Sequence, residues 1–154
     1  YAPYFMEGIK LRYPEYCRDL TPPKRKDMER FAEEYQRVLL ELPSYHDLKD
    51  ENSYHMMTLG MCAFLRKDYD IKSNRETGEG RSDICLYAKH DRYPNLILEF
   101  KYTKDEKDDL EKLAEKALEQ IKGKQYDAEM TGEVCYVGLA HYGKRSCIRW
   151  RKNG

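Results

Sequence analysis

The sequence predicts an α+β protein of 154 residues in which helices flank a β-sheet of mixed direction. Two segments with helical periodicity come first, and three β-prone segments then follow one another with short turns between them, which is typical of an antiparallel meander. A further helical segment separates this meander from two last strands. Because a helix between two strands of one sheet acts as a crossover and leaves them parallel, we expect both kinds of strand pairing.

Apolar residues at helical spacing predict three helices. The first covers residues 24–42 and ends at Pro43, which has no backbone N–H to continue a helix. The second covers about residues 50–67, with an apolar face built mainly from Tyr, Met, Phe and Leu. The third covers residues 107–122, with an apolar stripe of Leu, Ala and Ile. Residues 1–23 show no sustained period.

Five shorter segments combine β-branched, aromatic and other apolar residues between turn signals, and we expect them to be strands. They are residues 69–75, 81–88, 95–102, 134–140 and 146–150. A shift in composition near Pro43 suggests an N-terminal extension over residues 1–43, with one helix, and a compact core over residues 44–154.

Composition excludes several classes of protein. Lys and Arg number 28 and so do Asp and Glu, so the net charge is zero and a strongly basic nucleic-acid-coating protein is excluded. No apolar run reaches about 18 residues, and no signal peptide is visible, so we expect no membrane association. Five cysteines without a CxxC pair indicate a reducing, cytoplasmic environment. Because the chain begins at Tyr1, we expect it to be a piece of a longer protein.

Three charged residues lie in strands that are otherwise apolar. Asp83 begins the apolar run of one strand, and Glu99 and Lys101 lie on the same face near the end of the next. If these strands are antiparallel, the start of one lies beside the end of the other, and the three side chains converge. Two carboxylates at close range repel each other unless a cation intervenes. Oxygen ligands of this kind suit Mg²⁺ or Mn²⁺, and a neighbouring lysine suits hydrolysis of a phosphodiester. The alternative is a plain Glu99–Lys101 pair with Asp83 as a turn residue.

Asp83, followed by Glu99-Phe100-Lys101, resembles the motif of the PD-(D/E)XK nuclease superfamily, although Ser82 stands where a proline usually precedes the aspartate. The resemblance is to the branch found as the C-terminal nuclease-like domain of bacterial predicted AAA-type ATPase proteins, and it covers roughly residues 27–150. The segments that carry it are residues 41–46, 51–55, 74–83, 97–101, 117–121, Tyr126 and 137–140.

The resemblance implies a restriction-endonuclease-like αβββαβ core and a metal-dependent nuclease that cuts DNA, with Mg²⁺ or Mn²⁺ as cofactor. It implies that Asp83, Glu99, the Phe100 carbonyl and Glu51 contact the metal, and that Lys101 is the catalytic lysine. It also places Gln120 and Tyr126 in the lining of the active site. It further implies an AAA-type ATPase domain in the full-length chain and is compatible with a homodimer.

Several of these residues have an ordinary structural interpretation as well. Glu51 suits the first turn of a helix, Gln120 flanks an apolar stripe, and Tyr126 suits a core or rim position. Arg75 and Arg81 flank a glycine-rich turn, where they either support a hairpin or contact substrate phosphate. Two other functions stay open: a catalytically silent nucleic-acid-binding or regulatory module of the same fold, and a nuclease directed at RNA.

Overall fold

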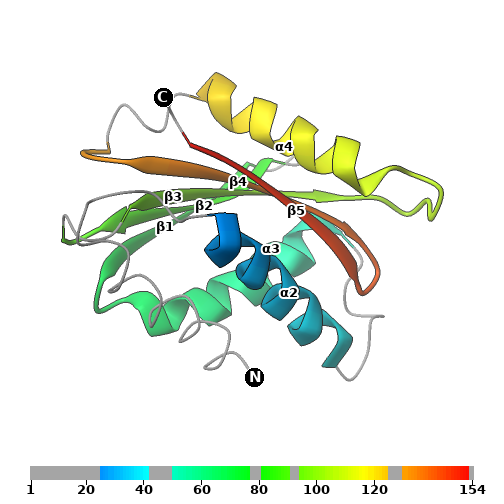
Figure 1. Cartoon of the computed structure of the whole chain (residues 1–154), viewed down its shortest axis with the longest axis horizontal. Coiled ribbons are helices and arrows are strands. Elements are labelled where there is room, and N and C mark those ends of the chain that lie inside the picture. Colours follow the sequence, from blue (N-terminus) through cyan, green and yellow to red (C-terminus); the bar gives the residue numbers. More distant parts are fainter. Residues whose placement is uncertain (1–24, 42–49, 77–80, 91–93, 125–129, 153–154) are drawn as a thin grey trace.

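The structure is a computed structural model that describes residues 25–41, 50–76, 81–90, 94–124 and 130–152. These residues form three layers, with a five-stranded sheet in the middle (Figure 1). Helix α4 (Leu110–Lys124) covers one face of the sheet, and α2 (Arg25–Glu41) and α3 (Glu51–Cys62) cover the other. A short 3₁₀ turn, η3 (Ala63–Leu65), continues α3. The predicted α+β fold with a mixed sheet is therefore confirmed.

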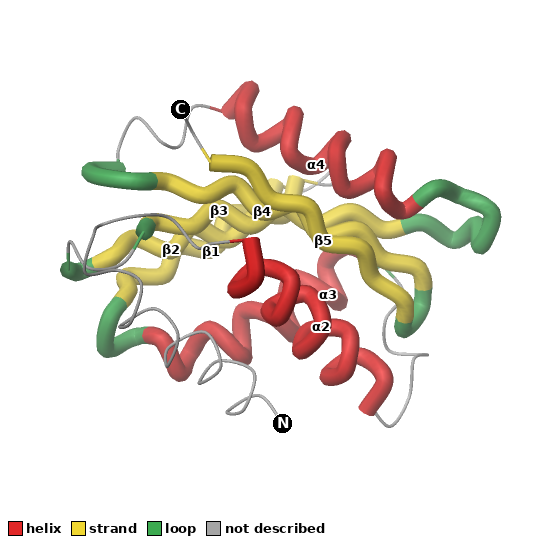
Figure 2. Tube along the Cα trace, viewed as in Figure 1, coloured by secondary structure: helices red, strands yellow, loops and turns green. Residues whose placement is uncertain are grey.

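The strands lie in the sheet in the order in which they occur in the chain. They are β1 (Tyr69–Glu76), β2 (Arg81–Ala88), β3 (Asn95–Tyr102), β4 (Val134–Tyr142) and β5 (Arg145–Lys152). Neighbouring strands are antiparallel except β3 and β4, which are parallel. Figure 2 shows the reason: α4 runs back across the sheet from the end of β3 toward the start of β4. The predicted crossover is confirmed.

Helix α4 begins three residues later than the sequence predicts. Asp109 Oδ1 accepts hydrogen bonds from the backbone N–H groups of Glu111 (2.9 Å) and Lys112 (3.4 Å), so Asp109 caps the first turn. The N–H of Lys107 bonds instead to the carboxylate of Asp105 at 2.9 Å, in the preceding turn. The residues before Leu110 are charged, and each of them would suit a helix surface. The apolar period alone therefore could not show which aspartate caps the helix.

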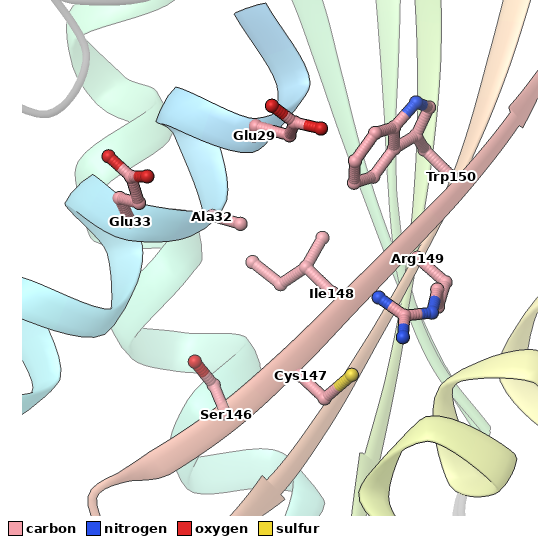
Figure 3. Close-up of a pocket in the computed structure, with 8 residues that line it drawn as sticks. All are labelled: Glu29, Ala32, Glu33, Ser146, Cys147, Ile148, Arg149 and Trp150. Carbon is pink, nitrogen blue, oxygen red and sulfur yellow. The ribbon is translucent and has the colours of Figure 1, made fainter. Parts of the chain in front are cut away.

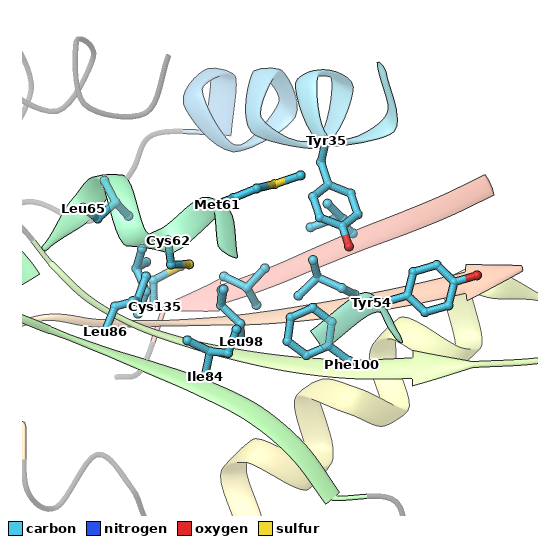
Figure 4. Close-up of a cluster of buried hydrophobic side chains, with 14 of the residues drawn as sticks. Tyr35, Tyr54, Met61, Cys62, Leu65, Ile84, Leu86, Leu98, Phe100 and Cys135 are labelled. Carbon is cyan, nitrogen blue, oxygen red and sulfur yellow. The ribbon is translucent and has the colours of Figure 1, made fainter. Parts of the chain in front are cut away.

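Both faces of β3 are buried, as expected for a central strand. Leu98 and Phe100 point toward α2 and α3, where they join a large hydrophobic core with Tyr54 and Leu86 (Figure 4). Ile97 points the other way and packs in a second cluster with Leu118, Ile121 and Tyr136 under α4. The alternation along each strand thus assigns Asp83, Glu99 and Lys101 to the α4 face.

Helix α2 shares the main core with the sheet. Tyr35 and Leu39 are fully buried in it. Gln36 bonds to the β4–β5 hairpin: its amide nitrogen donates to the Lys144 carbonyl (2.6 Å), and its oxygen accepts from the backbone N–H (2.7 Å) and hydroxyl (2.9 Å) of Ser146. Residues 42–49 lie outside the described part, so the domain boundary near Pro43 stays a prediction. Within the ranges given above, no helix has the length and apolar character needed to cross a bilayer.

Candidate active site

The two predicted acids lie side by side. The antiparallel register of β2 and β3 pairs Asp83 directly with Glu99, and both side chains are fully buried. Directly opposed residues on one face have their Cβ atoms about 4.5–5.5 Å apart. The register therefore brings two carboxylates to one point in the interior, as the sequence predicts from the antiparallel arrangement.

A third strand supports Asp83. Asn74 of β1 is the register partner of Asp83, and its amide Nδ2 donates a 2.9 Å hydrogen bond to Asp83 Oδ1. The amide therefore holds the Asp83 carboxylate in one orientation. Asn74 belongs to the segment that carries the family resemblance, but strand periodicity alone does not single it out.

Lys101 lies two residues beyond Glu99 on the same strand and face, and it is nearly buried. Its Nζ is 4.0 Å from Glu51 Oε1. Glu51 reaches this position because Asp50 caps α3: Asp50 Oδ1 accepts from the N–H (2.9 Å) and the hydroxyl (2.9 Å) of Ser53. The cap places Glu51 in the first helical turn, at the end of the sheet that carries the lysine.

Strands β2 and β3 separate next to the acids. Their pairing runs from Leu86 opposite Leu96 to Asp83 opposite Glu99, and it ends there. The main chain at Phe100 therefore lies at a fork between two strands, where a carbonyl oxygen is not part of the β2–β3 ladder. This location fits the predicted role of the Phe100 carbonyl, which itself stays a prediction.

Helix α4 lies close over the acids. Gly138 of β4 is the register partner of Glu99, and a Cβ atom on it would lie 2.4 Å from the Ala114 carbonyl oxygen. Gln120 of α4 is half-buried, and its Oε1 is buried with no hydrogen-bond partner among the residues that the structure describes. The preceding residue, Glu119, accepts a hydrogen bond from Arg151 of β5, and Gln120 lies about 100° further round the helix. Its role in the site stays a prediction.

The donor set suits a hard divalent cation. Two buried carboxylates repel each other, and a cation that keeps several waters relieves this repulsion. No group of three or more His, Cys, Asp or Glu side chains gathers at one point in the described ranges. Two carboxylates with a nearby main-chain carbonyl fit Mg²⁺ or Mn²⁺, which bind few protein ligands, better than they fit a zinc site.

The side chains of the three predicted substrate contacts are not described. Tyr126 is in residues 125–129, which the structure does not describe. Arg75 and Arg81 lie at the ends of β1 and β2, beside the turn, where Arg75 pairs with Ser82 and Arg81 with Glu76. Their side chains are not described. The roles of these three residues therefore stay predictions.

Two arginines of β5 contact glutamates on α4. Arg149 is 2.8 Å from Glu111. Arg151 contacts Glu115 (2.9 Å) and Glu119 (3.1 Å), both on α4. These ion pairs join β5 to α4 across the edge of the sheet. A hollow of about 760 Å³ between α2 and β5 (Figure 3) includes Glu29, Glu33, Arg149 and Trp150 and contains none of the predicted site residues.

Sequence reasoning missed His141, which is fully buried in β4 beside the site. Its Nδ1 is 3.0 Å from the Lys101 carbonyl oxygen, and its Nε2 is 2.7 Å from the Tyr35 hydroxyl. Burial lowers the pKa of His141 to about 3, against a smaller opposing effect of the bond to Lys101, so the imidazole is neutral. The sequence shows only a histidine at the end of an apolar strand. It does not reveal that the partners of this histidine are Lys101, 40 positions away, and Tyr35, 106 positions away.

His55, one turn after Glu51 on α3, is also buried. Its Nε2 is 2.6 Å from the Ser73 hydroxyl, and its ring lies 5.5 Å from that of Phe100. The ring therefore packs on the face of the sheet opposite to the acids. His55 is therefore a packed residue of the core.

Comparison with protein families agrees with this geometry. A model of the PD-(D/E)XK nuclease superfamily matches residues 49–150, which run from just before α3 into β5 and include Asp83, Glu99 and Lys101. The chain belongs to the PD-(D/E)XK nuclease superfamily. This membership suggests a metal-dependent nuclease and implies binding to nucleic acid. No curated protein matches the chain.

Proposed function

We propose that this domain hydrolyses phosphodiester bonds of DNA with the help of Mg²⁺ or Mn²⁺. The observation that carries the proposal is the direct pairing of Asp83 with Glu99 in the interior, with Lys101 two residues further on the same face. Two carboxylates held side by side in the interior repel each other, and a cation bound at the fork of the two strands would relieve that repulsion.

In this proposal, Asp83, Glu99 and the Phe100 carbonyl would hold the cation, with Glu51 close by. A bound divalent cation lowers the pKa of a coordinated water and neutralises charge on the phosphate. Asn74 keeps the Asp83 carboxylate in place through its 2.9 Å bond.

Lys101 would orient the attacking water and offset the negative charge that develops on the phosphate oxygens. The water would lose one proton as its oxygen bonds to phosphorus, one ester P–O bond would break, and the leaving oxygen would take up a proton, so that the protons balance. Glu51 Oε1 lies 4.0 Å from Lys101 Nζ and would help to hold the ammonium group in the site. Gln120 would present its amide to the same space from α4.

The proposal extends to the substrate contacts, the partners and the location of the protein. Arg75, Arg81 and Tyr126 would contact the nucleic acid, in which case the substrate passes the end of the β1–β2 hairpin. An AAA-type ATPase domain in the full-length chain would couple hydrolysis to ATP, a homodimer would allow both strands to be cut, and the protein would act in the cytoplasm. The ATPase domain, the homodimer and the role of Tyr126 rest on the family resemblance, whereas the cytoplasmic location rests on the cysteine pattern and the two arginine contacts on their place beside the glycine-rich turn.

The test is a cleavage assay with single- and double-stranded DNA and with RNA, in Mg²⁺, in Mn²⁺ and in a chelator. We expect cleavage of DNA that needs the divalent ion and is lost in Lys101→Ala and Asp83→Asn. Lys104→Ala, which removes an exposed lysine just after β3, is the matched control and is expected to cleave normally.

The alternatives predict different results. Binding of DNA without cleavage under any condition would favour a regulatory module, and preferential cleavage of RNA would favour an RNA-directed nuclease. Equal cleavage by the wild type and both site variants would identify a contaminating nuclease and contradict the proposal.

A further inference from the structure

A continuous series of buried hydrogen bonds connects α3, α2, β4 and β3. Thr58 of α3 is 3.3 Å from the Tyr35 hydroxyl of α2, which is 2.7 Å from His141 Nε2 of β4. His141 Nδ1 is in turn 3.0 Å from the carbonyl oxygen of Lys101 in β3. Thr58, Tyr35 and His141 are at most 1% exposed. The series therefore ends on the main chain of the residue proposed as the catalytic lysine.

The chemistry of the four groups allows one direction for these bonds. A carbonyl oxygen only accepts, so Nδ1 of the neutral imidazole must carry the proton. Nε2 then accepts, and the Tyr35 hydroxyl donates to it. The hydroxyl oxygen of Tyr35 is left as an acceptor for the Thr58 hydroxyl. A network with one allowed arrangement holds the His141 ring in a defined orientation.

Aromatic packing further restricts the His141 ring. It stacks on Tyr54 with ring centroids 3.9 Å apart and an interplanar angle of 21°. Phe100 lies 6.2 Å away in a stacked arrangement, and Tyr35 lies 5.6 Å away at a tilt. Figure 4 shows Tyr35 and Tyr54 reaching into the same core from the helices on this side of the sheet. The imidazole therefore has little freedom to leave the Lys101 carbonyl.

At Lys101, strand β3 pairs with β4 on one side but no longer pairs with β2 on the other. The ladder of β2 with β3 ends at Glu99, whereas the parallel register with β4 continues past Lys101 to Tyr102 opposite His141. The backbone of His141 also accepts a 3.0 Å hydrogen bond from the N–H of Thr103. His141 thus contacts the main chain on both sides of Tyr102, through its side chain and its own carbonyl.

We propose that Tyr35 and His141 are positioning residues that hold the Lys101 main chain, so that α2 is a working part of the active site. The inference rests on the proposed nuclease function. It goes beyond the family match, because that match begins at residue 49 and α2 ends at Glu41. A displacement of a catalytic group by about 1 Å can cost on the order of a hundredfold in rate, so a distant anchor of this kind has a measurable effect.

The first test compares two variants with the same chemical change. Tyr35→Phe removes the hydroxyl that bonds to His141. Tyr54→Phe removes a hydroxyl that donates to the Gly143 carbonyl at 2.7 Å and leaves the stack on His141 intact. We expect kcat to fall about tenfold in Tyr35→Phe and less than about twofold in Tyr54→Phe, with KM unchanged in both. The shift in melting temperature caused by Mn²⁺ is expected to persist in both variants, because no proposed metal ligand changes.

The second test replaces the histidine. Asparagine can place its amide nitrogen near the position of Nδ1 and can still donate to the Lys101 carbonyl, whereas leucine cannot. We expect His141→Asn to retain several times more of kcat than His141→Leu. Losses that merely follow the melting temperature, equal in Tyr35→Phe and Tyr54→Phe and equal in the two His141 variants, would overturn the proposal.

A separate readout distinguishes failure of this inference from failure of the proposed function. If the wild type cleaves no nucleic acid, the nuclease proposal fails, and the positioning proposal is decided by NMR. We expect ¹⁵N shifts of a neutral His141 ring protonated on Nδ1, and Tyr35→Phe should shift the amide signals of residues 101–103 while Tyr54→Phe leaves them in place. A ring protonated on Nε2, or unchanged signals at residues 101–103 in Tyr35→Phe, would overturn it.

Discussion

Replacing Glu99 by glutamine should stabilise the metal-free protein while it removes the response to metal. Glu99 and Asp83 are paired in register and fully buried, so their Cβ atoms are about 5 Å apart, and we take the same separation for their charges. At that distance and an effective dielectric constant of about 20, their repulsion is on the order of 3 kcal/mol. Lys101 on the same face offsets part of it, which leaves an expected gain of about 1–2 kcal/mol. For a domain of this size that gain corresponds to a rise in melting temperature of about 3–6 °C.

Thermal unfolding with and without Mn²⁺ measures both effects. Mn²⁺ should raise the melting temperature of the wild type by mass action, because the ion binds the folded state. Glu99→Gln should start higher and respond little. Glu115→Gln, which removes an exposed partner of Arg151 on α4, is the matched control and should respond to Mn²⁺ as the wild type does. If Glu99→Gln unfolds at a lower temperature and retains the full metal shift, then the two acids neither repel each other nor share a cation.

Two further predictions concern the fold around the site. Because burial lowers the pKa of His141 to about 3 from 6.5, its contribution to stability is complete above about pH 6.5 and is lost as the pH falls toward 3. Urea unfolding should show that the wild type loses about 2 kcal/mol more than His141→Asn between pH 7 and pH 5, and equal losses would contradict the burial argument. Gly138→Ala should lower the melting temperature by about 3–10 °C, because its Cβ would lie 2.4 Å from the Ala114 carbonyl oxygen; an unchanged melting temperature would show that α4 can move away from the sheet without cost.

The part of the site that lies on adjacent strands could be predicted from the sequence. A period of two assigns Asp83, Glu99 and Lys101 to one face, and a short connection between two strands makes them antiparallel. These two rules bring the start of β2 beside the end of β3, and the register then pairs Asp83 with Glu99. The same local rules account for the agreement between the predicted and observed ranges of the strands.

The support around the site could not be predicted in this way, because it depends on how the layers pack. Helical periodicity places Tyr35 on the buried face of α2, but it says nothing about which strand that face meets. The bond from Tyr35 to His141 spans 106 positions in the chain, and the bond from His141 to Lys101 spans 40. Asn74 is likewise a polar residue in an edge strand until the register places it opposite Asp83.

Lys101 contacts both sides of the sheet. Its side chain points to the α4 face with Asp83 and Glu99, whereas its carbonyl is held by an imidazole in the core under α2 and α3. A change on the α4 face alters charge, so it should change metal binding and turnover together. A change in the core under α2 leaves the charges in place and alters geometry alone, so it should lower turnover and spare metal binding. The middle position of the sheet therefore makes the two contributions separable by experiment, even though both act on one lysine.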